Sequence, residues 1–185
     1  MLEISQYHKH DDIVERCKQG DQRAYAEIYT LYSKAMFNIC HRITRNMEMS
    51  EDVLQEAFVS AFQHLHSYQG RASFGAWLKK IVVNKAISHL RKQQVQFDEI
   101  DERLDVPEEN GLDEMELVLK VETVKSAIMK LPNGFRVVFS LYLLEGYDHK
   151  EIAEILDISE STSKTQYNRA KKKLKEILKE EVYHE

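Results

Sequence analysis

Long apolar runs are absent from this sequence of 185 residues. No segment approaches the ~18 consecutive apolar residues that a membrane-spanning helix needs. The N-terminal segment MLEISQYHKHDD lacks the basic start and the apolar stretch of a signal peptide. The sequence therefore predicts no membrane span and a protein that stays in the cytoplasm.

Cysteine, proline and glycine are scarce, with 2, 2 and 6 residues respectively. Cys17 and Cys40 lie far apart among apolar residues and without a CxxC motif, so we expect buried reduced thiols rather than a disulfide or a metal site. Helix breakers are few, and apolar residues follow helical rather than alternating spacing. Together these two features predict an all-α fold.

Acidic residues are missing from one long stretch. Between Ala57 and Phe97 there is no Asp or Glu but six Lys or Arg, whereas residues 98–116 hold ten acids and a single Arg103. The formal net charge of −5 is therefore segregated along the chain. The negative total charge argues weakly against a nucleic-acid partner. Because the charges are segregated, a nucleic-acid partner is still compatible with the sequence.

The acidic stretch also indicates how the chain is divided. It has no usable period and contains Pro107 and Gly111, which is typical of a flexible linker. We therefore expect two small helical domains, residues 1–95 and 114–185, joined by an acidic linker over residues 96–113.

Three helices are expected before residue 66. The first is capped by Asp11 or Asp12 and ends at Gly20, and the second runs from about Asp21 to Arg45. The buried stripe expected on this second helix is Ala24, Tyr25, Ile28, Leu31, Tyr32, Ala35, Ile39 and Ile43.

The third helix is expected to start with Ser50 as its cap. Its apolar face is Val53, Leu54, Ala57, Phe58, Ala61, Phe62 and Leu65. Its opposite face presents Asp52, Gln55, Glu56 and Val59, a set with helical spacing that no intrachain contact requires. This face is either a partner surface or an ordinary solvated face.

A loop over residues 64–72 is followed by a helix that begins near Ser73. One side of this helix carries Trp77, Lys80, Asn84, Ser88 and Arg91 within roughly one quadrant. Next to a loop with Tyr68 and Arg71, this mixture of aromatic, amide and cationic groups suits a strand with exposed bases. The alternative is that Trp77 simply packs in the core.

Residues 146–174 follow the pattern of a helix-turn-helix. A helix from about Glu114 to Leu131 and another starting at Pro132 are expected before it, with Gly146 ending the latter. Asp148 and Glu151 form a capping box, and Ser159 caps the second helix of the motif. Ile152, Ile155 and Leu156 form the apolar face of the first helix.

The second helix of this motif separates an inner and an outer face. Ser163, Tyr167, Ala170 and Leu174 are expected to face the protein. The outward set is Ser161, Thr162, Lys164, Thr165, Asn168, Arg169 and Lys172, and residues 161–175 hold six Lys or Arg and no acid. This pattern favours a DNA recognition helix, with a solvated helix end as the alternative.

Taken together, these segments resemble a bacterial RNA polymerase sigma factor of the short extracytoplasmic-function (ECF) class of the sigma-70 family. The resemblance rests on DVLQEAF (52–58), FGAWL (74–78), NKAI (84–87), Leu131-Pro132 and residues 146–174, in the same order as in the family. It covers nearly the whole chain.

The resemblance implies a non-enzymatic subunit that binds core RNA polymerase, directs it to promoters and helps to melt the −10 element. Asp52, Gln55 and Glu56, together with Val59 on the same face, correspond to the helix that docks on the clamp coiled coil of the largest subunit. The −10 contacts correspond to Tyr68, Arg71, Phe74, Trp77, Lys80, Asn84 and Arg91.

The resemblance also assigns the second domain and further partners. The −35 contacts correspond to Ser161, Thr162, Lys164, Thr165, Asn168, Arg169 and Lys172. The acidic linker corresponds to the segment that threads toward the catalytic centre. The polymerase flap region and an anti-sigma factor are further partners, and no cofactor, metal or catalytic residue is implied.

Three residues depart from the family pattern. Ser88 replaces a usual Asp, Ser163 replaces a usual Val on the buried face, and Gln166 replaces a common Arg. We expect Ser163 to loosen the packing of the recognition helix and Gln166 to change a phosphate contact.

Two other functions fit parts of the sequence. A dimeric transcription regulator would explain the helix-turn-helix but not the Trp77 stripe or the acid-free stretch. An enzyme or metal protein could use the histidine pairs His8/His10 and His64/His66, yet no recognisable catalytic or metal motif accompanies them.

Overall fold

The computed structural model describes residues 10–93 and 121–182, and the regular structure in both ranges is helical, as predicted. The chain divides into two compact units, residues 1–93 and 94–185. Because the linker expected over residues 96–113 and the helix start expected at Glu114 lie outside the described residues, both stay predictions.

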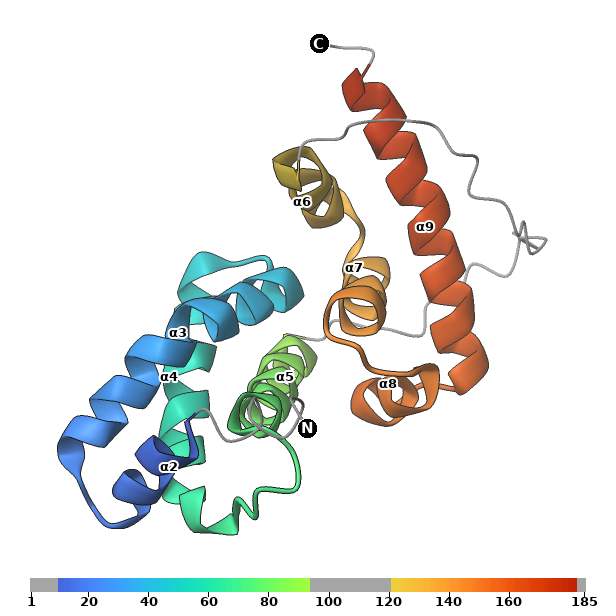
Figure 1. Cartoon of the computed structure of the whole chain (residues 1–185). Helices are drawn as coiled ribbons and strands as arrows, with labels where there is room; N and C mark the ends of the chain where they lie inside the picture. Colours follow the sequence, from blue (N-terminus) through green and yellow to red (C-terminus); the bar gives the residue numbers. More distant parts are fainter. Residues whose placement is uncertain (1–9, 94–120, 183–185) are drawn as a thin grey trace, which may run out of the picture. The chain divides into compact units, whose positions relative to one another are not determined.

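The first unit is a small helical bundle (Figure 1). It contains α2 (Asp11–Lys18), α3 (Gln22–Thr44), α4 (Met47–Gln63), the short 3₁₀ turn η1 (Leu65–Ser67) and α5 (Phe74–Lys92). Helices α3, α4 and α5 pack against one another in all three pairs, and α2 packs against α3. The core that they enclose includes Ala24, Ile28, Ile43, Val53, Ala57, Leu65, Leu78, Val82 and Ile87.

The helix starts follow local capping chemistry, and two of the predicted caps are wrong. Asp21, near which this helix was expected to begin, is the N-cap of α3 and accepts a hydrogen bond from the backbone N–H of Arg23. Helix α4 begins earlier than predicted, because Asn46 has extended backbone and accepts from the N–H of Met49. Ser50 is instead a buried residue inside α4. Asp11 and Asp12 lie in the first turn of α2, whose N-cap residue is His10.

The buried stripe of α3 also differs in part from the expected one. Leu31 is 48% exposed, and Ala35 is exposed as well. From Ile28 the contact face advances four residues to the half-buried Tyr32 and again to Met36, which leaves Leu31 on the outer side. A three-residue step and a four-residue step are equally compatible with helical spacing, and only the neighbouring helices select between them.

Both cysteines are buried free thiols, which confirms the prediction. Burial raises the pKa of the Cys40 thiol to about 12 and that of the Cys17 thiol to about 11. Neither thiol is therefore ionised at neutral pH, and both behave as small apolar core residues.

The second unit is built around one long helix (Figure 1). It contains α6 (Val121–Lys130), α7 (Asn133–Phe139), the π-helical turn η2 (Ser140–Leu144), α8 (His149–Leu156) and α9 (Glu160–Val182). Helices α6, α7 and α8 each pack on α9. One core cluster is Ala127, Ile128, Leu131, Phe139, Ala170, Leu174 and Ile177.

A fully buried arginine joins α6 to α7. Arg136 has no exposed surface, and its guanidinium donates to the carbonyl oxygen of Leu131 at 3.1 Å and to Oδ1 of Asn133 at 2.9 Å. Pro132 is the N-cap residue of α7, and Gly146, with φ of +78°, follows the π-helical turn in the left-handed region that favours glycine.

Within residues 10–93 and 121–182, no helix combines the length and the apolarity needed to span a bilayer. In the same ranges, His, Cys, Asp and Glu form no group of three or more that could hold a metal ion.

Candidate nucleic-acid and protein interfaces

The first candidate surface is the outer face of α4. Asp52, Gln55, Glu56 and Val59 are all exposed, as predicted, and Val59 keeps 55% of its surface in solvent.

Glu56 also contacts the neighbouring helix. Its carboxylate lies 3.2 Å from Nε2 of His89 and 3.6 Å from Nζ of Lys85, both on α5. The close contact with His89, aided by the charges of His89 and Lys85, lowers the pKa of Glu56. Glu56 thus links α4 to α5, while Asp52 and Gln55 project from the same face.

The second candidate surface is the outer side of α5. Lys80, Asn84, Ser88 and Arg91 are exposed along one side of the helix, as the spacing predicted. The hydroxyl of Ser88 donates to the backbone oxygen of Asn84 at 2.8 Å. An amide flanked by two cations can bind an unpaired base and its backbone.

Trp77 has features of both predicted roles, core packing and an exposed surface for a base. Its ring packs against Tyr68 and Phe74, with ring centroids at 5.6 and 5.5 Å, yet the residue is only half-buried. Trp77 therefore packs against core aromatic rings and also keeps some exposed surface on the helix that carries Lys80 and Asn84.

Two residues predicted to contact −10 DNA are core residues instead. Tyr68 is 6% exposed and Phe74 is 2% exposed, and their rings pack together at 5.5 Å. The prediction treated the segment before α5 as an open loop. The tyrosine ring of that loop instead turns inward and fills the space between η1 and α5. Arg71, at the loop tip, is exposed as expected.

One contact of this loop was missed by the sequence reasoning. Lys18, at the end of α2, donates from Nζ to the carbonyl oxygen of Tyr68 at 3.3 Å. The two residues lie 50 positions apart, and no periodic or motif signal connects them.

The third candidate surface is the helix-turn-helix of α8 and α9. The predicted capping box is present, with both the Asp148 side chain and the Glu151 side chain accepting from the opposite backbone N–H. Asp157 adopts the left-handed conformation at the end of α8, with φ of +56°. Ser159 accepts from the N–H of Thr162 at 2.9 Å and so caps α9, as predicted.

The outward face of α9 agrees with the prediction except at one residue. Ser161, Lys164 and Lys172 are exposed, and Thr165, Asn168 and Arg169 are partly exposed. Thr162 is only 9% exposed. Its hydroxyl lies 2.8 Å from the hydroxyl of Ser159, so the cap that starts the helix also turns Thr162 away from solvent.

Lys164 forms an ion pair on the same helix. Its Nζ lies 2.7 Å from Oε1 of Glu160, one turn earlier. This contact lowers the pKa of Glu160 and raises the pKa of Lys164. An acid at the helix start thus reduces the positive field that α9 presents to an anion.

The expectations for the two unusual inner residues of α9 need correction. Ser163 is fully buried, and its hydroxyl lies 2.9 Å from Nδ1 of His149, so it makes a specific contact instead of loosening the packing. Gln166 is 4% exposed and therefore faces the protein rather than a phosphate. Its carboxamide lies beside Gly134, where an added Cβ would come within 3.1 Å of the Gln166 oxygen.

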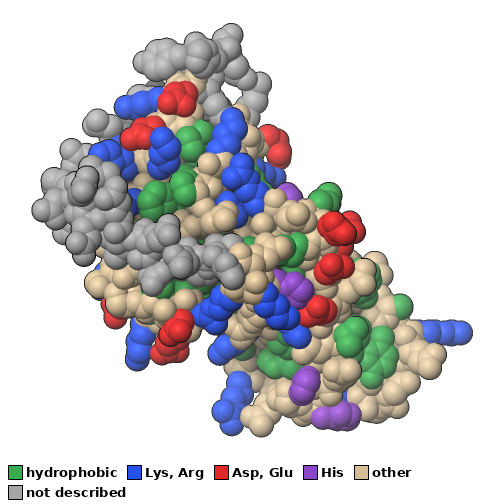
Figure 2. Space-filling model, turned by 180° about the vertical axis from the view of Figure 1, so that it is seen from behind, with side chains coloured by type: hydrophobic (Ala, Val, Ile, Leu, Met, Phe, Trp, Pro, Cys, Tyr) green, Lys and Arg blue, Asp and Glu red, His purple; other side chains and the backbone are tan. Residues whose placement is uncertain are grey.

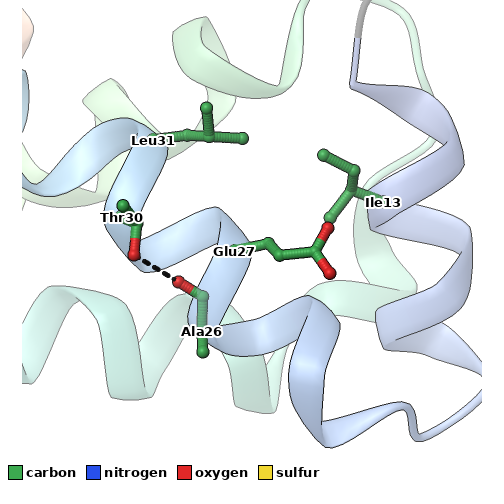
Figure 3. A pocket seen from close by; sticks show the side chains of 5 residues that line it. All are labelled: Ile13, Ala26, Glu27, Thr30 and Leu31. Carbon is green, nitrogen blue, oxygen red and sulfur yellow. Dashed lines mark hydrogen bonds between the residues drawn. The ribbon is translucent and has the colours of Figure 1, made fainter.

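An open pocket of about 450 Å³ lies between α2 and α3 (Figure 3). It is lined by Ile13, Ala26, Glu27, Thr30 and Leu31. The one carboxylate in this lining, that of Glu27, binds Arg16 at 2.9 Å. The lining therefore lacks the set of polar groups expected of a catalytic pocket.

Surface side chains are mixed in character on the face drawn in Figure 2. Lys and Arg side chains are spread over it, and the hydrophobic side chains form small separate patches. In the second unit, three consecutive residues of η2, Tyr142, Leu143 and Leu144, are exposed by 37, 54 and 46%.

Comparison with known proteins places both units in one family. The Sigma-70 region 2 family matches residues 28–95, and the Sigma-70, region 4 family matches residues 122–174. The ECF RNA polymerase sigma factor SigW of Bacillus subtilis (strain 168) is 29% identical over 179 residues, which cover 90% of this chain and 95% of SigW. The chain belongs to the ECF class of the sigma-70 family.

Other relatives extend this similarity to distant bacteria. The ECF RNA polymerase sigma-E factor of Escherichia coli (strain K12) is 29% identical to this sigma factor over 174 residues, covering 86% of this chain and 88% of the relative. The family relationship makes this protein a transcription initiation factor that directs RNA polymerase to promoters.

Solved structures share the fold of this sigma factor. The sigma factor RpoE of Bartonella quintana, in complex with the anti-sigma factor NepR, has a TM-score of 0.55 and 22% identity, covering 84% of this chain and 96% of RpoE. CnrH, in complex with the cytosolic domain of CnrY, has a TM-score of 0.52 and 22% identity, covering 90% of this chain and 95% of CnrH.

Proposed function

We propose that this sigma factor performs promoter recognition through three separate surfaces, each on one face of one helix. The outer face of α4 binds core RNA polymerase, the outer side of α5 with the preceding loop binds the melted −10 element, and the outer face of α9 binds the −35 element. In this proposal residues 1–95 form the core-binding and −10 domain, residues 96–113 the linker and residues 114–185 the −35 domain.

The docking role of α4 is supported by what its exposed residues offer. Asp52, Gln55 and Val59 project from one face, so a basic or polar helix on the polymerase clamp has a polar surface with one apolar contact to bind. Glu56 contributes to the same surface, although its carboxylate also contacts His89 and Lys85.

The single observation that carries the proposal is the side of α5. The partly exposed Trp77 and the exposed amide of Asn84 lie on one helix face with the exposed cation of Lys80. Bases bind proteins through stacking on their faces and through hydrogen bonds to their edges, and the faces and the Watson–Crick edges are accessible only when the strands are apart. A regulator that binds only duplex DNA has no use for such a face.

The −35 role of α9 follows from its position in the helix-turn-helix. Ser161 and Thr165 are accessible near the helix start, where a recognition helix reads base edges. Lys172 and the neighbouring lysines are exposed later in the helix and suit phosphate contacts.

We propose two further partners, one from an exposed apolar segment of the second unit and one from the family relationship. We assign the polymerase flap region to the exposed apolar residues Tyr142, Leu143 and Leu144, since consecutive exposed apolar side chains are typical of protein contacts. An anti-sigma factor is the expected regulator. The protein needs no catalytic residue of its own for these roles, and it works in the cytoplasm alongside the polymerase.

The test is reconstitution with core RNA polymerase. We expect the purified chain to co-elute with the core enzyme and to direct transcription from a subset of promoters in a mixed library. A chain that forms a stable symmetric dimer, binds a palindrome without polymerase and gives no promoter-specific transcript would overturn the proposal.

A further inference from the structure

The loop between η1 and α5 is closed by one of its own side chains. Gln69, Gly70, Arg71 and Ala72 are all exposed, and they form the tip of this loop. The hydroxyl of Tyr68, just before the tip, donates to the carbonyl oxygen of Ala72, the last residue of the tip, at 2.8 Å. Gly70 has φ of +69°, a left-handed conformation that lets the tip turn tightly.

The base of the loop is fixed at both ends. The ring of Tyr68 packs edge-on against Phe74 with the ring centroids 5.5 Å apart. The backbone N–H of Tyr68 donates to the carbonyl oxygen of Leu65 at 3.1 Å. At the other end, Ser73 caps α5 by accepting from the N–H of Ala76 at 3.3 Å. The four tip residues therefore project from two rigid points.

Helix α2 supplies a third attachment. Nζ of Lys18 donates to the backbone oxygen of Tyr68 at 3.3 Å and lies 5.7 Å from the centre of its ring. The same ammonium lies 2.8 Å from Oε1 of Glu15, and the Lys18 side chain is only 20% exposed. A cation held in this way is directed at the loop base rather than at solvent.

We propose that Tyr68 and Lys18 are positioning residues that hold Gln69–Ala72 as a preformed loop for an unpaired base of the −10 element. This inference rests on the proposed function of α5 and the preceding loop. A loop already held in its binding conformation loses less conformational entropy when a base binds. Neither Tyr68 nor Lys18 touches the DNA in this arrangement, and their effect is transmitted through the tip.

The first test removes only the hydroxyl of Tyr68. Tyr68→Phe keeps the ring packing with Phe74 and Trp77 and loses the bond to Ala72. Tyr25→Phe is the matched control, because the Tyr25 hydroxyl also donates to a backbone oxygen, that of Cys17 at 2.9 Å, and its ring also packs edge-on, against Phe62 at 4.8 Å. Both variants lose one hydroxyl bond in the same unit, but only one changes the loop.

The measurement uses holoenzyme and a fluorescent single-stranded −10 oligonucleotide. We expect Tyr68→Phe to weaken binding about five-fold, the effect of one lost hydrogen bond, while core binding is unchanged and Tyr25→Phe binds normally. Amide hydrogen exchange at Tyr68 and Ala76, whose N–H groups are bonded at the two ends of the loop, should also be faster in Tyr68→Phe alone. Equal DNA affinity and equal exchange in the two variants would overturn the inference.

The second test separates positioning by Lys18 from a direct phosphate contact. Lys18→Met keeps the aliphatic stem and removes the ammonium, and Glu15→Gln removes only the ion pair. We expect Lys18→Met to weaken oligonucleotide binding several-fold without changing its salt dependence, and Glu15→Gln to have little effect. A decrease of the salt slope by about 0.7 in Lys18→Met would show a phosphate contact and overturn the positioning role.

The wild-type holoenzyme distinguishes the two possible failures. If wild type prefers its −10 oligonucleotide over a scrambled one and Tyr68→Phe behaves like Tyr25→Phe, the inference about the loop fails and the proposed function stands. If wild type itself shows no preference, the proposed function of this surface fails, and the positioning role fails with it.

Discussion

Nδ1 of His149 lies 2.9 Å from the hydroxyl oxygen of Ser163, so the first residue of α8 contacts the inner face of α9. The His149 ring also stacks on Tyr142 at 4.4 Å and meets Tyr167 edge-on at 5.7 Å. A polar pair here occupies the place where two helices of the helix-turn-helix approach each other. This contact therefore joins α8 to the inner face of α9.

The first prediction concerns this pair. Ser163→Ala leaves the ring nitrogen of the partly buried His149 without this partner, and we expect a loss of about 0.5–1.5 kcal/mol in the free energy of unfolding. Urea denaturation of Ser163→Ala, His149→Ala and the double variant should give a coupling energy of about 0.5–3 kcal/mol. Ser126→Ala, at an exposed serine of α6, is the control and should change little. Additive losses in the double variant would show that the pair is not coupled.

The second prediction concerns pH. Burial, aided by the charge of Lys164, lowers the pKa of His149 below its usual 6.5. The unfolded chain therefore binds this proton more readily than the folded one, so the stabilising contribution is complete above pH ~6.5 and decreases as the pH falls through the folded pKa. Urea midpoints between pH 5 and 8 should fall on acidification, and His149→Gln should flatten that decrease.

Carboxylates act in a lower range of pH. The pKa values of Glu56 and Glu160 are lowered from 4.5, so their contributions are lost only below that value. An unchanged pH profile in His149→Gln between pH 5 and 8 would contradict the assignment to His149.

The third prediction concerns the outer face of α4. Gln55→Ala combined with Glu56→Lys should abolish binding to core RNA polymerase, because it removes a polar contact and reverses a charge. Replacing Glu56 with Lys also places a cation near Lys85, so circular dichroism should be used to verify unchanged helical content. Glu122→Lys, at an acid of α6 whose side chain is 82% exposed, is the charge-matched control. Undiminished core binding in a pull-down of the double variant would remove the docking assignment.

The fourth prediction concerns the ion pair of Lys164 with Glu160 on the recognition helix. Glu160→Gln removes a negative charge near the DNA and releases Lys164, so we expect tighter binding to −35 DNA and a salt slope steeper by up to about one unit.

Two other residues of α9 should act differently. Lys172→Ala should weaken binding similarly on all sequences and reduce the slope by about one unit. Ser161→Ala should alter preference at one or two base pairs, at a cost of about 1–3 kcal/mol. DNA affinity that is unaffected by all three changes would place this helix away from the −35 element.

The fifth prediction concerns promoter melting by α5. Asn84→Ala and Lys80→Ala should leave the fold and core binding intact but reduce open-complex formation on duplex promoters. The defect should shrink when the −10 segment is supplied already mismatched, because the enzyme then no longer has to separate the strands. Lys34→Ala, at an exposed lysine of α3, is the control. Normal permanganate reactivity of the −10 thymines in both α5 variants would contradict a melting role for this face.

Features set by a few neighbouring residues were predictable from the sequence. The capping box of Asp148 and Glu151, the cap at Ser159 and the exposed face of Asp52, Gln55 and Val59 follow from local hydrogen bonds and helical spacing, and all are present. The family resemblance was equally predictable, because it rests on short motifs in a fixed order.

Features set by tertiary packing were not predictable. Tyr68 turns into the core because Phe74 and Trp77 of α5 surround its ring and Lys18 of α2 binds its backbone oxygen. The spacing of residues along the sequence does not indicate such contacts. The prediction that Thr162 is exposed was wrong for a different reason. Its hydroxyl is bonded to that of the capping Ser159, whereas helical spacing alone places the side chain on the outward face.

The buried guanidinium of Arg136 has a consequence for how the second unit unfolds. One of its partners, the Leu131 carbonyl, directly follows α6, and another, the Asn133 carboxamide, is the first residue of α7, so detaching α6 together with Leu131 removes a hydrogen bond from a charge buried in the core. A buried charge that loses one partner is strongly destabilising, on the order of 3–5 kcal/mol. Partial opening at this junction is therefore costly, and α6 and α7 should exchange their amide hydrogens as a single cooperative unit.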